Sequence, residues 1–154
     1  MVHKTFAEIT QYIKDGIAIP KCYVNDIIRI ETDFGKNAQI IDITFNKTVI
    51  IKLSSTVYNI SFINCIFNAP IYFEGNCILK DFGFFDCEFN SSFSIDNVSA
   101  TKFEIAGCFL KRGIHSHGLV AETLRLELLK SDSAKLNFYK PHLSNCFISK
   151  IHGL

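Results

Sequence analysis

The sequence predicts an all-β protein, a right-handed parallel β-helix solenoid with a short N-terminal capping helix. From Ile40 onward, apolar residues recur two positions apart in short runs, which is the periodicity of strands with one buried face. A motif centred on cysteine repeats with a period near 20 residues, and a fixed period of this kind indicates a solenoid. With 154 residues, 48% of them hydrophobic, the chain is predicted to form one domain over residues 1–154.

The first segment is expected to form a helix over about residues 5–15. Thr5 and Glu8 have the spacing of a capping box, and Gly16 stands where a helix would end. Three apolar residues follow helical spacing: Phe6, Ile9 and Ile13. Because this apolar stripe is narrow, the helix must lie against another element. Covering the open end of a β structure and lying on the side of a core both fit.

Turns of the β-helix are expected between about residues 40 and 150. The apolar pairs that predict its strands are Ile41/Ile43/Phe45, Val49/Ile51/Leu53, Ile60/Phe62, Ile71/Phe73, Phe82/Phe84, Phe93/Ile95 and Phe103/Ile105. Within one turn these pairs fall on three faces, so each turn should contain three short parallel strands. Residues 119–131 fit either an amphipathic helix or a strand, and the alternation from Leu124 to Leu128 favours the strand.

Four cysteines carry the repeat: Cys65, Cys87, Cys108 and Cys146, of which the first three are one period apart and the last follows after an interval read as two turns. The residue before each cysteine is Asn64, Asp86, Gly107 or Asn145, types that tolerate left-handed backbone angles and therefore turn a corner. Each cysteine is then expected to point inward, where a small apolar side chain fits. Stacked turns would place the four thiols in one column about 4.8 Å apart, which is too far for disulfides. Metal binding is not expected, because Cys-x-x-Cys and Cys-x-x-His spacings are missing.

Several short triplets resemble the pentapeptide-repeat pattern, in which a small residue lies two positions before a central Leu or Phe. They are Cys65-Ile66-Phe67, Cys87-Glu88-Phe89, Thr101-Lys102-Phe103 and Ala134-Lys135-Leu136. The resemblance covers about residues 57–115 and, more weakly, 134–150. Because the period departs from four uninterrupted pentapeptides, strict square geometry and a less regular right-handed β-helix both fit. Pentapeptide-repeat proteins include inhibitors of DNA topoisomerases that mimic the charge of DNA, which requires a strongly acidic surface.

Charge and hydropathy exclude several classes of partner. The chain has 16 Lys+Arg and 15 Asp+Glu, a net charge of +1, so neither a basic nucleic-acid-binding surface nor acidic DNA mimicry is expected. No apolar run reaches the roughly 18 residues that a transmembrane helix needs, so no membrane contact is expected. The N-terminus has no signal-peptide pattern, and free thiols suit a reducing compartment, so we expect a cytoplasmic protein.

Two polar groups are candidates for catalytic or metal sites. His115-Ser116-His117 lies between two glycines and is expected to be an exposed polar loop, because no third metal ligand and no catalytic partner is signalled. The acids Asp81, Asp86, Glu88 and Glu104 lie on neighbouring turns but in no common column. We therefore expect no catalytic residue, no cofactor and no metal. A carbohydrate-active β-helix enzyme remains an alternative by fold analogy alone.

Outward positions beside the cysteines predict a binding surface. One residue after each cysteine the sequence has Ile66, Glu88, Phe109 and Phe147, and two residues before it has Ile63, Phe85, Ala106 and Ser144. The apolar members predict a partner-binding stripe of Ile63, Ile66, Phe85, Phe109 and Phe147, unless the chain's own termini cover this corner. The expected function is a non-enzymatic protein-binding module, an inhibitor or effector that binds a protein partner or forms a homodimer. The alternative is an assembly or scaffold element that stacks through its open end.

Overall fold

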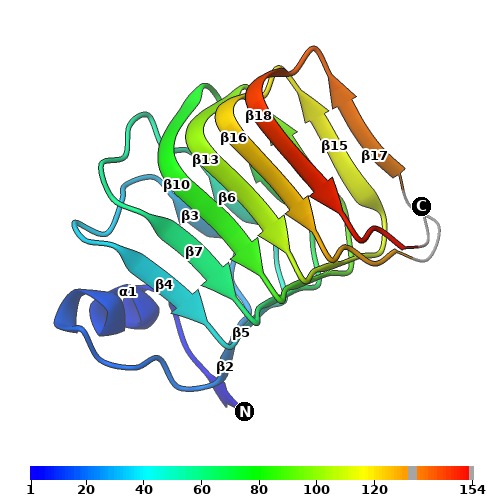
Figure 1. The fold of residues 1–154 in the computed structure, drawn as a ribbon. Helices are drawn as coiled ribbons and strands as arrows, with labels where there is room; N and C mark the ends of the chain where they lie inside the picture. Colours follow the sequence, from blue (N-terminus) through cyan, green and yellow to red (C-terminus); the bar gives the residue numbers. More distant parts are fainter. Residues whose placement is uncertain (132–134, 153–154) are drawn as a thin grey trace.

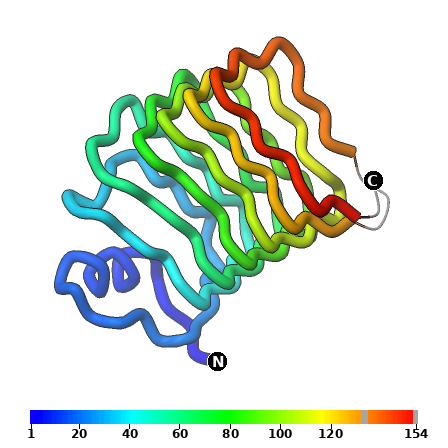
Figure 2. Tube along the Cα trace, viewed as in Figure 1, coloured from blue at the N-terminus to red at the C-terminus, as the bar shows by residue number. Residues whose placement is uncertain are grey.

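The computed structural model describes residues 1–131 and 135–152 and shows a parallel β-solenoid of about 7 turns (Figure 1). Three six-stranded sheets run along it, as the three predicted faces require. Successive turns stack along one axis, which is clearest in the chain trace of Figure 2. Each strand pairs in parallel with the equivalent strand of the next turn, so that Thr44 is in register with Ile66 and Glu88 with Phe109.

The sheets are named A, B and C in the order in which the chain first enters them. Sheet A contains β1 (Val2–His3), β2 (Cys22–Val24), β5 (Ile43–Phe45), β8 (Ile66–Phe67), β11 (Glu88–Phe89) and β14 (Phe109–Leu110). Sheet B contains β3 (Ile28–Ile30), β6 (Val49–Ile51), β9 (Ile71–Phe73), β12 (Phe93–Asp96), β15 (Gly113–His117) and β17 (Lys135–Tyr139). Sheet C contains β4 (Ala38–Ile41), β7 (Ile60–Ile63), β10 (Cys77–Phe85), β13 (Val98–Ala106), β16 (Val120–Glu127) and β18 (His142–Ser149).

The stacked strands begin with β1 and β2, earlier than the expected start near residue 40. Cys22 and Val24 in β2, and Ile28 and Ile30 in β3, show the same alternation of buried and outward positions as the later turns. Residues 119–131 contain the predicted strand, β16, with Leu124 and Leu126 buried. Because β2 and β3 are only three residues long, each offers a single buried pair as its sequence pattern.

Left-handed residues form the corner between sheets C and A. Asn64 (φ 52°), Asp86 (φ 54°) and Gly107 (φ 67°) turn the chain before each cysteine, as predicted. The column continues through Leu128 and Lys150, both with positive φ, and not through Asn145. Asp42 (φ 60°) occupies the same position in an earlier turn, so the apparent run Ile41/Ile43/Phe45 is two strands separated by a corner.

Phenylalanine rings fill the interior in stacked columns. Phe45, Phe67 and Phe89 of sheet A stack with centroid separations of 5.1 and 5.0 Å. Phe62 and Phe84 of sheet C stack at 5.1 Å. All five rings are almost completely buried. Offset stacking adds to the large apolar area that each ring removes from water, so these columns hold successive turns together.

The corner between sheets A and B carries an asparagine ladder. The side-chain amide of Asn46 donates to Asn25 Oδ1 (2.9 Å), that of Asn68 to Asn46 Oδ1 (3.0 Å), and that of Asn90 to Asn68 Oδ1 (2.9 Å). Asn46 and Asn68 therefore both donate to the preceding turn and accept from the following one. The spacing of these asparagines matches the turn length and is present in the sequence, but the cysteine motif does not point to it.

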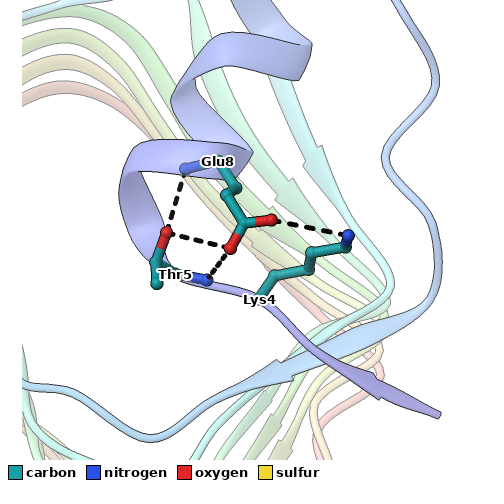
Figure 3. Close-up of polar contacts among 3 residues, drawn as sticks. All are labelled: Lys4, Thr5 and Glu8. Atoms are coloured by element: carbon teal, nitrogen blue, oxygen red, sulfur yellow. Dashed lines mark hydrogen bonds and ion pairs between the residues drawn. The ribbon is translucent and has the colours of Figure 1, made fainter.

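The helix α1 (Phe6–Asp15) closes the N-terminal end of the solenoid (Figure 1). Thr5 Oγ1 accepts from the backbone N–H of Glu8, and the Glu8 carboxylate accepts from the Thr5 backbone N–H and contacts the Lys4 ammonium at 3.5 Å (Figure 3). Gly16 ends the helix with φ 65°. Ile9 is fully buried in the solenoid core, so the helix covers the end of the β structure. Among the described residues no helix has the length and hydropathy needed to cross a membrane.

Candidate protein-binding surfaces

Four of the five predicted stripe residues lie together at the corner between sheets C and A. Ile63 and Phe85 are register partners on β7 and β10, and Ile66 and Phe109 lie on β8 and β14 with Glu88 between them. All four side chains are half-buried. The two apolar columns therefore flank an outer corner, but the exposed Asn64 and Asp86 separate them and Glu88 interrupts the column of Ile66 and Phe109.

The stripe is flatter than the sequence suggests because Phe85 lies against its own sheet. Its ring occupies the space outside Gly83, where an added Cβ would collide with it. Ala106, the next residue of this column, adds little apolar surface. This packing reduces the exposed area of the stripe, although its role in partner binding stays a prediction.

Phe147 does not belong to the stripe. It lies on β18 in register with Arg125 of β16, and the Arg125 guanidinium lies 5.1 Å from the centre of its ring. The residues that continue the column after Phe109 are Lys130 and His152. The sequence alignment places Cys146 two turns after Cys108. In the structure, the residue two turns after Cys108 is Ile151.

The thiol column contains three of the four predicted cysteines. Cys65, Cys87 and Cys108 are buried, and each Sγ lies 3.3–3.4 Å from a backbone carbonyl of the preceding turn. Burial raises the pKa of the Cys65 and Cys108 thiols. Cys146 is exposed on β18, and Leu129 fills the column position after Cys108. All six cysteines are free thiols.

His115-Ser116-His117 forms part of strand β15 and not the expected loop. Ser116 points inward and its buried hydroxyl donates to the Ile95 carbonyl at 2.6 Å. Both imidazoles are exposed on the outer face, and the ring of His115 lies 5.6 Å from that of Tyr139. In residues 1–131 and 135–152, no three His, Cys, Asp or Glu side chains are grouped so that they could hold a metal ion.

The candidate acids lie in different columns, as the sequence indicated. Asp81 is in register with Lys102, whereas Glu88 lies between Ile66 and Phe109. Glu104 forms ion pairs with Lys102 (3.1 Å) and Arg125 (3.7 Å). Asp86 stands at a corner, where its carboxylate fills the space beside Gly107. The acids are thus separated from one another and one is already paired with two cations.

The last turn exposes two inward-pointing side chains of β18, Cys146 and Ile148, whereas Leu136, Phe138 and Leu143 are half-buried against the core. Leu126 and Ile148 are register partners in β16 and β18, yet Leu126 is 1% exposed and Ile148 is 58% exposed. Leu124 is buried, and its partner Cys146 is exposed. Within the described part of the chain, nothing packs on this end, and Figure 1 shows it opposite α1. The sequence motif could not reveal this surface, because Ile148 has the pattern of a core residue.

Charge is one-sided at the same end. Residues 135–152 contain Lys135, Lys140 and Lys150 and no Asp or Glu. The part of the triplet pattern at Ala134 lies outside the described residues. The open end is therefore an apolar surface with a basic border. Comparisons of the chain with protein-family models, curated proteins and solved structures found no match.

Proposed function

We propose that this protein is a non-enzymatic assembly module that associates through its open C-terminal turn. The observation that carries the proposal is the contrast between Leu126 and Ile148, which hold equivalent positions but are 1% and 58% exposed. A further turn or a partner would bury Ile148 as β18 buries Leu126. The corner stripe is the weaker candidate for the association surface, because its side chains are already half-buried.

Two physical forces favour association at this end. Burying an exposed Ile or Phe side chain contributes about 1.5–3 kcal/mol, and Phe147 and Ile148 are 51% and 58% exposed. The strands β17 and β18 are also the edge strands of sheets B and C. An unprotected strand edge presents unpaired N–H and C=O groups that favour pairing with another strand. A polypeptide that adds a strand would bury these side chains and pair the free backbone groups.

The repeat pattern supports kinship with pentapeptide-repeat proteins. In the turn that starts at β10, buried pairs are Cys77/Leu79, Phe82/Phe84, Cys87/Phe89 and Phe93/Ile95. The pairs follow one another at intervals of five or six residues, and the long strand β10 carries two of them. One additional residue before β12 separates this turn from four uninterrupted pentapeptides, which favours the less regular form of β-helix.

Analytical ultracentrifugation of the purified chain tests the proposed function. We expect the weight-average mass to rise with concentration from the low micromolar range upward. Ile148→Lys should abolish this rise while leaving the circular dichroism spectrum unchanged. Ile78→Lys is the matched control, because Ile78 is 52% exposed on the side of the solenoid, away from the open turn. A wild-type chain that stays monomeric at all concentrations, or equal association by Ile148→Lys, would overturn the proposal.

A further inference from the structure

We propose that the occupant of the open end is a second copy of this chain in head-to-tail orientation. In this arrangement the free edge of β18 enters a groove beside β4 at the N-terminal end of the next copy. The inference rests on the proposed function and adds the receiving surface and the direction of assembly. It is carried by three independent features: the phase of the free backbone groups, the groove and the charges of the two ends.

The two free strand edges have complementary backbone groups. In a parallel ladder, alternate residues bond to opposite neighbours. Ala38 and Asp42 donate their backbone N–H groups to Asn59 and Ile63 of the following turn, so Gln39 and Ile41 face the free edge of β4. No backbone bond to Gln39 or Ile41 from outside the strands occurs within the described residues.

The free edge of β18 has the matching phase. The Ser149 carbonyl accepts from the Leu128 N–H of the preceding turn, so the backbone N–H and C=O of Ser149 point toward β16. The backbone N–H and C=O of Ile148 therefore point toward the free edge. The backbone groups of Cys146, two residues earlier, point toward the free edge for the same reason. Ile148 of one copy can therefore lie opposite Ile40 of the next and exchange backbone hydrogen bonds with Gln39 and Ile41, by the same alternation that joins β4 to β7.

A groove is present along the receiving edge. It has a volume of about 620 Å³, with Ile13, Ile17 and Ile19 along one side and the polar side chains of Lys36, Gln39 and Asp42 also in its lining. It lies between β4 and the segment that follows α1. Ile17, which directly follows the C-cap Gly16, is 56% exposed there. An inserted β18 would bring the exposed Ile148 against the isoleucines of this groove.

Charge distinguishes head-to-tail from head-to-head contact. Residues 135–152 carry three Lys and no acid, so two C-terminal ends brought together would repel each other. Residues 1–42 contain six Asp or Glu and five Lys or Arg, α1 exposes Lys14 as well as Glu8 and Asp15, and the groove lining includes both Lys36 and Asp42. The N-terminal end, with its near-balanced charge, therefore repels the basic C-terminal end less than a second C-terminal end would. A head-to-tail contact does not close on two copies, so it produces an open filament or a ring.

A complementation experiment with two variants tests the direction of assembly. Ile148→Lys disables the C-terminal end, and Ile17→Lys places a cation in the groove, facing the basic end of the neighbour. We expect each variant alone to sediment as a monomer and their equimolar mixture to form a dimer, because one intact end remains on each. Ile27→Lys is the control for Ile17→Lys, since Ile27 is 64% exposed near the same end but does not line the groove.

The outcomes separate this inference from the proposed function. If Ile17→Lys associates as strongly as wild type while Ile148→Lys does not, contact is head-to-head; the inference fails and the proposed function stands. A mixture that remains monomeric also overturns the head-to-tail arrangement. If the wild-type protein does not associate at all, both the head-to-tail arrangement and the proposed function are wrong. Should Ile17→Lys fail to fold, Ala18→Lys tests the same groove, because Ala18 also lines it and is exposed.

Discussion

The side-chain amide of Asn68 donates a 3.0 Å hydrogen bond to Asn46 Oδ1 in the preceding turn and accepts one from Asn90 in the following turn. Asn68 is thus an interior member of the ladder, whereas Asn25 at its end only accepts. The ladder connects four turns through side chains alone. It adds a polar connection on the outside of a solenoid whose interior is held by stacked Phe rings.

Replacing an interior member of this ladder should destabilise the fold more than replacing its end. A typical hydrogen bond contributes about 0.5–1.5 kcal/mol net, so Asn68→Ala should lower the free energy of unfolding by about 1–3 kcal/mol. Asn25→Ala removes one bond and should lower it by about half as much. Urea denaturation of both variants measures this. Equal effects would show that the ladder bonds do not act additively.

Gly113 is expected to be the glycine least tolerant of substitution. It has φ 75°, and an added Cβ would collide with the backbone of Lys135 in the next turn. Gly75 has φ 70° but open space around it, so Gly75→Ala isolates the backbone strain of about 1–2 kcal/mol. Gly113→Ala should add about 1–3 kcal/mol of steric cost to that strain. Thermal denaturation that finds Gly75→Ala the more harmful change would contradict this packing.

The central Phe column should dominate stability. Phe84 is fully buried and contacts Phe62, Phe89, Phe93 and Phe103 through ring pairs. Phe84→Ala should therefore lower the free energy of unfolding by about 3–5 kcal/mol. Tyr58→Ala, at a 36% exposed position, should change it by no more than about 0.5 kcal/mol. Guanidinium unfolding compares the two, and similar values would show that Phe84 is not a core residue.

The solenoid could be predicted from the sequence because its inward positions must be apolar and its corners need left-handed residues. Asn64, Asp86 and Gly107 satisfy both the sterics of positive φ and the repeat pattern. Leu128 and Lys150 adopt the same backbone angle without the usual residue type, so the period could not be followed beyond Cys108. Asn145 and Cys146 have the residue types of the repeat motif, but they do not lie at the corner position that the motif marks in the earlier turns.

The candidate site could not be predicted for a different reason. Ile148 and Leu126 have the same local pattern, and only the presence or lack of a stacked turn makes one exposed and the other buried. Exposure at the end of a solenoid is a property of the whole stack, which short motifs do not encode. Ile63 and Phe85 are neighbours because both precede a true corner, and their role in binding stays a prediction.

The labelling rate of Cys146 as a function of protein concentration tests the central claim most directly. Cys146 is the exposed cysteine, and the other five are buried, so native protein should contain one thiol that reacts quickly with a maleimide. If the open turn is the association surface, this rate should fall as concentration rises and the end becomes covered. In Ile148→Lys the rate should remain high throughout. A rate for wild-type Cys146 that is independent of concentration while the protein associates would contradict the account.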